Sequence, residues 1–177
     1  IYKNNLFNKL EGKSRPHFFY GVTKVVSKLF NIINPTHAFF GEKDAQQLII
    51  IQEMISNMNY QINLVSCPTI RDKNGLALSS RNQYLSQEEQ IEAACFSQYL
   101  LEMKELINKG ELNSSILKNQ FEQRVSESKK IKLDYISIAN IKTLNETDNV
   151  QGDILVSAAV FFNNVRLIDN FTHQSST

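Results

Sequence analysis

The chain has 177 residues, and its 19 Lys and Arg side chains nearly balance its 18 Asp and Glu side chains. This balance excludes the strongly basic surface that DNA wrapping requires, so no nucleic-acid partner is expected. Hydrophobic residues make up 42% of the chain, enough for a buried core, but no apolar run approaches the roughly 20 residues that span a bilayer. We therefore expect a globular cytoplasmic protein without a membrane partner.

The first predicted element is a helix that begins near Val22. The segment before Pro16 is polar and rich in Lys and Asn, and we interpret it as a loop. Apolar residues then recur at helical spacing, which predicts one apolar helix face. They are Val22, Val25, Val26, Leu29, Phe30, Ile32 and Ile33. Asn34-Pro35 ends this helix, because the residue before a proline avoids the α region.

The next segment predicts a strand, a helix and a second strand. Residues 37–40 form a short apolar run typical of a buried strand, and 41–44 form a turn. A helix follows over 45–58, and a strand over 61–66. Strand, helix and strand with short joints indicate a βαβ unit with a parallel sheet.

The second half predicts two helices and three strands. After a polar loop over 71–82, Ser86 and Glu89 form a capping box that opens a helix to about 108. Another helix is expected over 112–128, and strands over 132–139, 154–162 and 165–168. Asn163-Asn164 is typical of a hairpin turn, and the tail from Phe171 is expected to fray.

The organisation changes near Leu78, from a parallel βαβ unit to helices with an antiparallel sheet. We therefore expect an α/β fold in which a parallel sheet is followed by a small α+β domain with antiparallel strands. The expected domains are 1–77 and 78–177, with a cleft between them.

The turn Gly41-Glu42-Lys43-Asp44 has two interpretations. A glycine after a strand allows close approach of a ligand, a lysine supplies a charge for phosphate, and the next helix adds free N–H groups. Alternatively, Asp44 caps the helix and Gln47 completes a capping box. From spacing alone the capping interpretation is favoured.

The turn Ser79-Ser80-Arg81-Asn82 also has two interpretations. Two hydroxyls and a guanidinium suit an oxyanion or phosphate, whereas a surface turn with an Arg ion pair is the simpler alternative. Ligands of parallel sheets bind at the carboxyl ends of the strands, where both turns lie. Lys43 and Arg81 could then converge on one polyphosphate.

The remaining polar residues favour structural roles. Arg15 could meet an anion and Phe18, Phe19 and Tyr20 could line a pocket, but Pro16 and Gly21 more simply shape the start of the helix. His17 and His37 are interpreted as structural or exposed. Cys67 and Cys95 form no CxxC spacing, and no metal site is predicted.

Four sequence blocks occur together in one order. They are Lys28-Leu29-Phe30-Asn31, Phe40-Gly41-Glu42-Lys43-Asp44 with Gln46-Gln47-Leu48, Gly75-Leu76-Ala77-Leu78-Ser79-Ser80-Arg81-Asn82, and Arg166-Leu167-Ile168-Asp169-Asn170. Over about residues 10–170, the sequence closely resembles the pantothenate synthetase (pantoate–β-alanine ligase) family.

The resemblance implies an ATP-dependent ligase with the Rossmann-like fold of the HIGH nucleotidylyltransferase superfamily. Such enzymes join the pantoate carboxylate to the α-phosphate of ATP, and β-alanine then attacks the pantoyl adenylate to give pantothenate and AMP. Mg²⁺ accompanies the nucleotide, and the full-length protein is usually a homodimer. Residues 1–77 would be the later part of an incomplete Rossmann-like nucleotide-binding domain, and 78–177 a carboxyl-terminal α+β lid domain.

The resemblance also implies the roles of site residues. The ATP contacts would be Gly41, Glu42, Lys43, Asp44, Ile70, Leu78, Ser79, Ser80 and Arg81. Among these, Lys43, Ser79 and Arg81 would be the catalytic groups on the phosphates, Asp44 would lie near the ribose, and Ile70 would offer its backbone to adenine. Gln47 would contact pantoate.

The chain departs from the family pattern at several points. The HxGH segment, the first Rossmann strands and the first pantoate glutamine of the family have no counterpart, so we expect the chain to match only the later part and to be inactive alone. After Arg-Pro, His17-Phe18-Phe19 replaces the usual Gly-His-Phe. Two alternatives stay open: another adenylating enzyme on the same fold, for which Gln47 is the discriminator, and a non-catalytic nucleotide-binding fragment.

Overall fold

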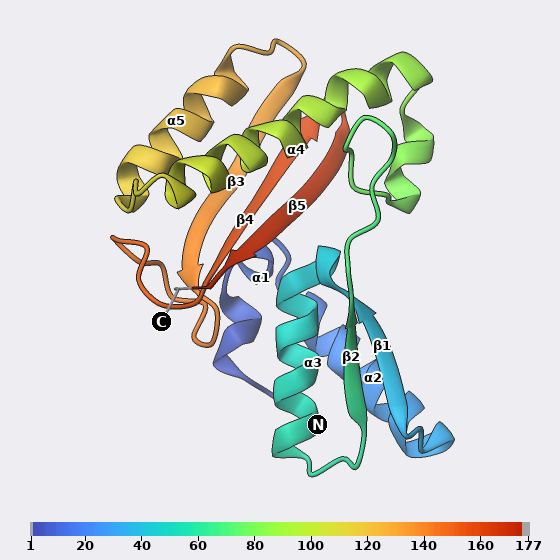
Figure 1. The fold of residues 1–177 in the computed structure, drawn as a ribbon. Coiled ribbons are helices and arrows are strands. Elements are labelled where there is room, and N and C mark those ends of the chain that lie inside the picture. Colours follow the sequence, from blue (N-terminus) through green and yellow to red (C-terminus); the bar gives the residue numbers. More distant parts are fainter. Residues whose placement is uncertain (1, 175–177) are drawn as a thin grey trace. The chain divides into compact units, whose positions relative to one another are not determined.

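The chain divides into two compact units between Pro68 and Thr69, and each unit has its own sheet (Figure 1). The structure is a computed structural model that describes residues 2–174. We call the units before and after this division unit 1 and unit 2. The assignment of 1–77 and 78–177 to nucleotide-binding and lid domains concerns function, and it stays a prediction.

The opening segment of unit 1 is ordered, so the expectation of a loop is wrong. It forms the 3₁₀ helix η1 (Asn5–Asn8) and the short helix α1 (Glu11–Ser14). The side chain of Gln46 donates to the carbonyls of Leu6 and Lys9 at 2.9 and 2.8 Å and accepts from the N–H of Glu11 at 3.0 Å. These bonds satisfy backbone groups that a short polar segment leaves unpaired, and they hold it on the unit.

Helix α2 (Phe18–Ile33) begins four residues before the expected start, and Asn34 ends it in the left-handed conformation with a φ of 47°. The expected apolar face is only partly buried. Phe30 is buried, but four members of the stripe are exposed: Val25, Leu29, Ile32 and Ile33. Periodicity therefore identified the helix correctly but not the burial of its face.

The βαβ unit is confirmed. Strand β1 (His37–Gly41) pairs in parallel with β2 (Asn63–Cys67), and the 3₁₀ helix η2 (Glu42–Asp44) and helix α3 (Ala45–Asn57) connect them. Ala38, Phe40 and Leu64 pack on a small core from α2 and α3. Phe39 points to the other face and is 68% exposed, so β1 is half-buried on one face and exposed on the other, contrary to the expected buried strand.

Unit 2 contains the expected helices followed by an antiparallel sheet. Its elements are η3 (Ser80–Tyr84), α4 (Gln87–Asn108), α5 (Ser114–Ser126), β3 (Ile131–Asn140), β4 (Ile154–Phe162) and β5 (Val165–His173). The sheet order is β3-β4-β5, and the turn at Asn163 has a φ of 50°. Strand β5 continues past Phe171, so the expected fraying is wrong up to His173, and residues 175–177 lie outside the described part.

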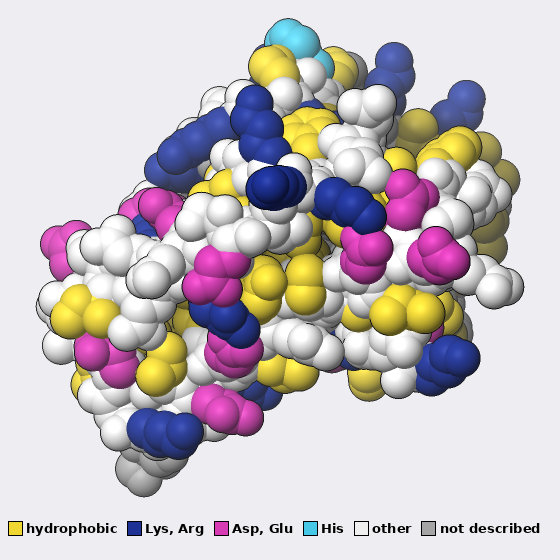
Figure 2. Space-filling model, turned by 90° about the horizontal axis from the view of Figure 1, so that it is seen from above, with side chains coloured by type: hydrophobic (Ala, Val, Ile, Leu, Met, Phe, Trp, Pro, Cys, Tyr) yellow, Lys and Arg dark blue, Asp and Glu magenta, His cyan; other side chains and the backbone are white. Residues whose placement is uncertain are grey.

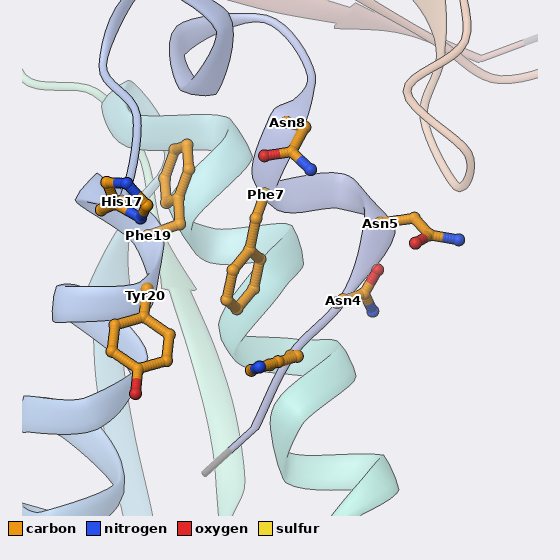
Figure 3. A pocket seen from close by; sticks show the side chains of 8 residues that line it. Asn4, Asn5, Phe7, Asn8, His17, Phe19 and Tyr20 are labelled. Carbon is orange, nitrogen blue, oxygen red and sulfur yellow. The ribbon is translucent and has the colours of Figure 1, made fainter.

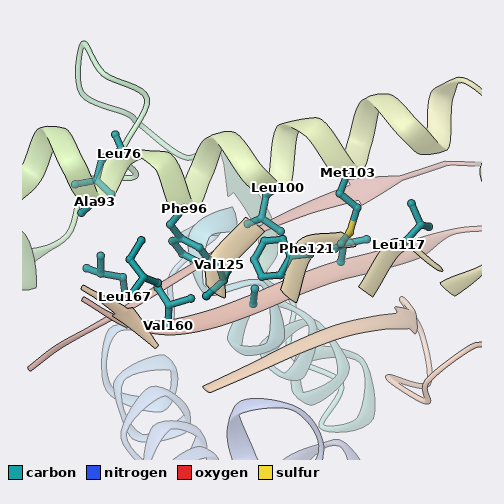
Figure 4. Packing of buried hydrophobic residues seen from close by; sticks show 14 of the residues in the cluster. Leu76, Ala93, Phe96, Leu100, Met103, Leu117, Phe121, Val125, Val160 and Leu167 are labelled. Carbon is teal, nitrogen blue, oxygen red and sulfur yellow. The ribbon is translucent and has the colours of Figure 1, made fainter. Parts of the chain in front are cut away.

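The core of unit 2 lies between the sheet and its two helices, which run across one face of it (Figure 1). Figure 4 shows Phe96 and Leu100 of α4 and Phe121 of α5 above the sheet, with Leu76 of the preceding loop beside Ala93 of α4. The capping box of α4 is present, because Ser86 accepts from the N–H of Glu89 and the Glu89 carboxylate accepts from the N–H of Ser86. The loop and the helices are therefore anchored in one core.

The distribution of charged side chains on the surface agrees with the nearly equal numbers of basic and acidic residues in the sequence (Figure 2). On the face shown in Figure 2, acidic side chains lie beside Lys and Arg side chains. No helix in the described part of the chain combines the length and the apolarity that a membrane crossing requires.

Candidate functional site

The first candidate region lies in unit 1, where β1 ends and α3 begins. Gly41 is the last residue of β1 and pairs with Cys67, and Glu42, Lys43 and Asp44 form η2 directly before α3. Asp44 occupies the N-cap position, but its side chain makes no capping hydrogen bond. The capping-box interpretation of Asp44 and Gln47 is therefore wrong, and the exposed carboxylate of Asp44 is not used to hold the helix.

Two adjacent glutamines at the start of α3 have different surroundings. Gln46 is buried, and its amide is fully engaged with the opening segment. Gln47 is half-buried, and no hydrogen bond ties it to that segment. The structural role of Gln46 was missed from the sequence, because its partners lie 35 to 40 residues away. Of the two, only Gln46 holds the opening segment, and the contact of Gln47 with pantoate stays a prediction.

The second candidate region lies in unit 2 and is a narrow hairpin over residues 70–78. The N–H of Leu78 donates to the carbonyl of Ile70 at 2.9 Å, and Arg71 pairs with Ala77. Asp72 Oδ1 accepts from the N–H groups of Asn74 and Leu76 at 2.8 and 2.9 Å. The hairpin thus brings two predicted nucleotide contacts, Ile70 and Leu78, side by side.

The hydroxyl of Ser79 and the side chain of Asn82 shape the turn after the hairpin. Ser79 Oγ accepts from the N–H of Arg81 at 3.2 Å and caps η3, and Asn82 Nδ2 donates to the carbonyl of Ala77 at 3.2 Å. Within residues 2–174 the guanidinium of Arg81 has no ion-pair partner. The ion pair expected for Arg81 is therefore wrong, although the turn lies at the surface, where Leu78 and Ser80 are exposed.

The predicted residues are thus gathered into two groups. The first group lies within residues 41–47 of unit 1 and comprises Gly41, Glu42, Lys43, Asp44 and Gln47. The second group lies within residues 70–81 of unit 2 and comprises Ile70, Leu78, Ser79, Ser80 and Arg81. Ile70 and Leu78, paired across the hairpin, are both exposed. Convergence of Lys43 with Arg81 would join the two units, and it stays a prediction.

A cavity of about 370 Å³ lies in unit 1 (Figure 3). It is lined by Lys3, Asn4, Asn5, Phe7, Asn8, His17, Phe19 and Tyr20. The expectation that aromatic residues of this segment line a pocket is confirmed for Phe19 and Tyr20. The Arg15 guanidinium lies 3.6 Å from the centre of the Phe18 ring. None of the predicted ATP or pantoate contacts lines this cavity.

The remaining candidate side chains are two histidines, of which His17 lines the cavity, and two cysteines. His17 and His37 are both exposed, as expected, and Cys67 and Cys95 are free thiols. Burial raises the pKa of Cys95, so a smaller fraction of this thiol is in the reactive thiolate form. Among the described residues, no group of three or more His, Cys, Asp or Glu side chains is arranged to hold a metal ion.

The two units define an α/β protein with a parallel βαβ part and an antiparallel α+β part, and this arrangement is shared with solved ligases. A pantothenate synthetase structure from Thermus thermophilus matches with a TM-score of 0.89 at 34% identity, covering 96% of this chain and 61% of the other. A pantoate-beta-alanine ligase from Francisella tularensis, complexed with beta-gamma ATP and beta-alanine, matches with a TM-score of 0.67 at 31% identity, covering 97% and 56%.

The sequence comparisons agree with the structural ones. A pantothenate synthetase from Acetivibrio thermocellus is 45% identical over 159 residues, which is 90% of this chain and 57% of the relative. One from Clostridium novyi is 46% identical over 167 residues, which is 94% of this chain and 59% of the relative. Residues 1–172 match the Pantoate-beta-alanine ligase family model. The chain belongs to this family, and it spans less than three fifths of the length of these curated relatives.

Proposed function

We propose that this chain is part of an ATP-dependent ligase that joins pantoate to β-alanine. The observation that carries this proposal is the match of residues 1–172 to the Pantoate-beta-alanine ligase family. The ATP and β-alanine complex of the Francisella tularensis relative supports both the nucleotide and the amine substrate.

The proposed reaction has two steps. The pantoate carboxylate attacks the α-phosphorus of ATP, so that a carboxylate oxygen bonds to phosphorus while pyrophosphate leaves. The amine of β-alanine then attacks the acyl carbon of the pantoyl adenylate, the amide bond forms, AMP leaves with that oxygen, and the amine loses a proton. Both steps develop negative charge on phosphate oxygens, which fixed cations stabilise.

The side chains of this chain would supply that stabilisation. Lys43, after β1, would contact the phosphates as a point charge, and Asp44 would accept from a ribose hydroxyl, because its carboxylate makes no helix cap. In unit 2, the guanidinium of Arg81 lacks an ion-pair partner in the described residues, so it would bind phosphate oxygens together with Ser79. Glu42, Ser80 and the backbones of Gly41, Ile70 and Leu78 would complete the nucleotide contacts, and Gln47 would bind pantoate.

Mg²⁺ would accompany the nucleotide rather than occupy a dedicated protein site. In the described part of the chain, acidic and His side chains form no cluster of three that suits a metal ion. Mg²⁺ is commonly bound through substrate phosphates and few protein ligands, so this donor set does not conflict with the nucleotide. No step assigned to this chain depends on a metal held by its own residues.

The activity belongs to the whole enzyme, of which 1–77 would serve nucleotide binding and 78–177 would serve as the lid. The chain spans 57% of the Acetivibrio thermocellus relative, so we expect the 177 residues alone to form no pantothenate. We further expect the whole enzyme to be a homodimer, which sedimentation of the whole enzyme would test.

Calorimetric titration of the chain with Mg–ATP tests the nucleotide part. Lys43→Ala and Arg81→Ala should each weaken ATP binding by about tenfold or more, because each removes a charge-assisted contact to phosphate. Lys24→Ala, at an exposed position on α2, is the matched control and should leave the ATP affinity unchanged. Unchanged affinity in both site variants would contradict the assignment.

The acid substrate is tested with Gln47→Ala. This change should weaken pantoate binding far more than ATP binding. If pantoate binding is unaffected, the alternative of another adenylating enzyme with a different acid substrate gains support. If ATP binds but pantoate has no effect on its affinity, a non-catalytic nucleotide-binding role gains support.

A further inference from the structure

Arg71 and Asp169 form an ion pair inside unit 2, although they lie 98 residues apart in the chain. Arg71 Nη1 donates to Asp169 Oδ2 at 2.6 Å, and Nη2 donates to Oδ1 at 2.9 Å. The Asp169 side chain is 2% exposed, whereas that of Arg71 is 31% exposed. A buried carboxylate is tolerated only when donors replace its water, and this bidentate geometry supplies two of them.

Two further donors complete the surroundings of Asp169. Ser97 Oγ, on α4, donates to Oδ2 at 2.7 Å, and the N–H of Asn170 donates to Oδ1 at 2.8 Å. Ser97 Oγ also accepts from Arg71 Nη1 at 3.3 Å. The hydrogen bond to Asp169 raises the pKa of Arg71 above its usual value, so the guanidinium stays charged. The result is a closed network that joins the hairpin, α4 and β5.

The same guanidinium also holds the tip of the hairpin. Arg71 Nη1 donates to the carbonyl of Gly75 at 3.1 Å, and Gly75 has a φ of 94°, a conformation that glycine adopts without strain. Leu76 follows directly and is buried in the core of unit 2. Figure 4 shows Leu76 beside Ala93 of α4. Two neighbouring residues of the hairpin are therefore held in different ways: Gly75 by a hydrogen bond from Arg71, and Leu76 by burial in the core.

We propose that Arg71, Asp169 and Ser97 are positioning residues that hold the hairpin so that Ser79 and Arg81 face the nucleotide. They act through the backbone of Gly75 and Leu76, and they need no contact with ATP themselves. The role in nucleotide binding rests on the proposed function, whereas the ordering of the hairpin is a property of unit 2 alone.

A second ion pair in the same unit provides a matched comparison. Arg166 on β5 pairs with Asp134 on β3 at 2.6 Å, with side chains that are 15% and 25% exposed. The hydrogen bonds of this pair join β3 to β5, two strands of the sheet. A general effect of losing an Arg–Asp pair would thus be seen in both places, whereas a positioning effect would be seen at the hairpin only.

The experiment compares Arg71→Lys with Asp134→Asn in the 177-residue chain. Lysine keeps the charge but loses the bidentate geometry and the contact to Gly75. Amide hydrogen exchange at Leu76 and Leu78 should accelerate about tenfold in Arg71→Lys, with exchange in β4 unchanged. The dissociation constant for Mg–ATP should rise about tenfold, with the pantoate affinity unchanged. Asp134→Asn should alter neither the hairpin exchange nor the ATP affinity.

The outcomes separate this inference from the proposed function. If the unaltered chain binds no ATP, the proposed function fails, and the exchange data alone then decide whether the network orders the hairpin. Unchanged exchange at Leu76 and Leu78 in Arg71→Lys would overturn the inference, whatever the ATP affinity. If Arg71→Lys loosens the whole of unit 2, Ser97→Ala, which keeps the ion pair, decides: faster exchange confined to the hairpin supports the inference, and no change overturns it.

Discussion

Helix α2 of unit 1 and strand β4 of unit 2 both have strongly apolar sequences, yet they differ in burial. In α2, Val25, Leu29, Ile32 and Ile33 are exposed, and Ile32 is 71% exposed. In β4, every residue from Ile154 to Val160 is buried. Unit 2 has two helices on a three-stranded sheet, whereas unit 1 has a two-stranded sheet, which is marginal as an independent structure. Apolar periodicity therefore identifies a face, and the neighbouring elements determine its burial.

The largest expected effect tests whether unit 2 depends on its own core. Phe96 is 1% exposed, and its ring meets that of Phe121 edge to face with centroids 6.3 Å apart. Phe96→Ala should lower the free energy of unfolding of unit 2 by about 3–5 kcal/mol, because it leaves a cavity. Urea unfolding followed by circular dichroism measures this. Ile91→Ala, at an exposed position on the same helix, is the control, and equal losses in both variants would break the comparison.

A smaller effect is expected for the polar anchor of unit 1. Gln46→Ala should cost about 1–3 kcal/mol, because it leaves backbone groups of the opening segment without partners. The loss should be local, so trypsin should cleave after Lys9 and Lys13 faster than in the unaltered chain. Gln47→Ala is the matched control at the next position. Equal cleavage rates in the three proteins would show that other contacts hold this segment.

The capping box of α4 gives an effect of about 1 kcal/mol. Ser86→Ala removes the hydroxyl that accepts from the N–H of Glu89, so the unfolding free energy of unit 2 should fall by about 1 kcal/mol. Ser115→Ala, in the first turn of α5 but not at its N-cap, should change it by a few tenths at most. A larger loss at Ser115 than at Ser86 would contradict this ranking.

The smallest effect concerns Tyr99 of α4 and appears only in alkali. Burial, and then the hydrogen bond with Cys95, raise the pKa of Tyr99 to about 12. Because the folded-state pKa exceeds the unfolded value, this contribution to stability is complete below the unfolded pKa and is lost as the pH rises through about 12. An ultraviolet titration of phenolate should show a late step that Tyr99→Phe removes and Tyr84→Phe leaves in place.

Local patterns predicted the secondary structure well, since their causes are local. The capping box at Ser86 gave the start of α4, and the β-branched and aromatic run gave β4 with both bounds correct. The position of the loop at Gly41 was also predicted, because a polar turn between a strand and a helix is a local signal. The expected helix-capping role of Asp44, by contrast, was wrong, because a side-chain cap depends on a side-chain conformation that spacing does not determine.

Features that depend on distant residues were missed. The order of the opening segment depends on Gln46, and the ion pair of Arg71 depends on Asp169, whose position next to the hairpin follows from the pairing of β5 with β4. Asp169 entered the sequence analysis only as part of a family block. A charged residue at the start of a glycine-containing loop, together with an acidic residue in an apolar strand, is a pattern that could have suggested the pair.

The separation between Arg71 and Asp169 has a consequence for the order in which the protein is made. A ribosome synthesises Arg71 98 residues before it reaches Asp169, on the last strand of the described sheet. Until that strand joins the sheet, the nascent hairpin has its arginine but no carboxylate to receive it. Nascent chains stalled before Asp169 should therefore expose this hairpin to a protease even after α4 has formed.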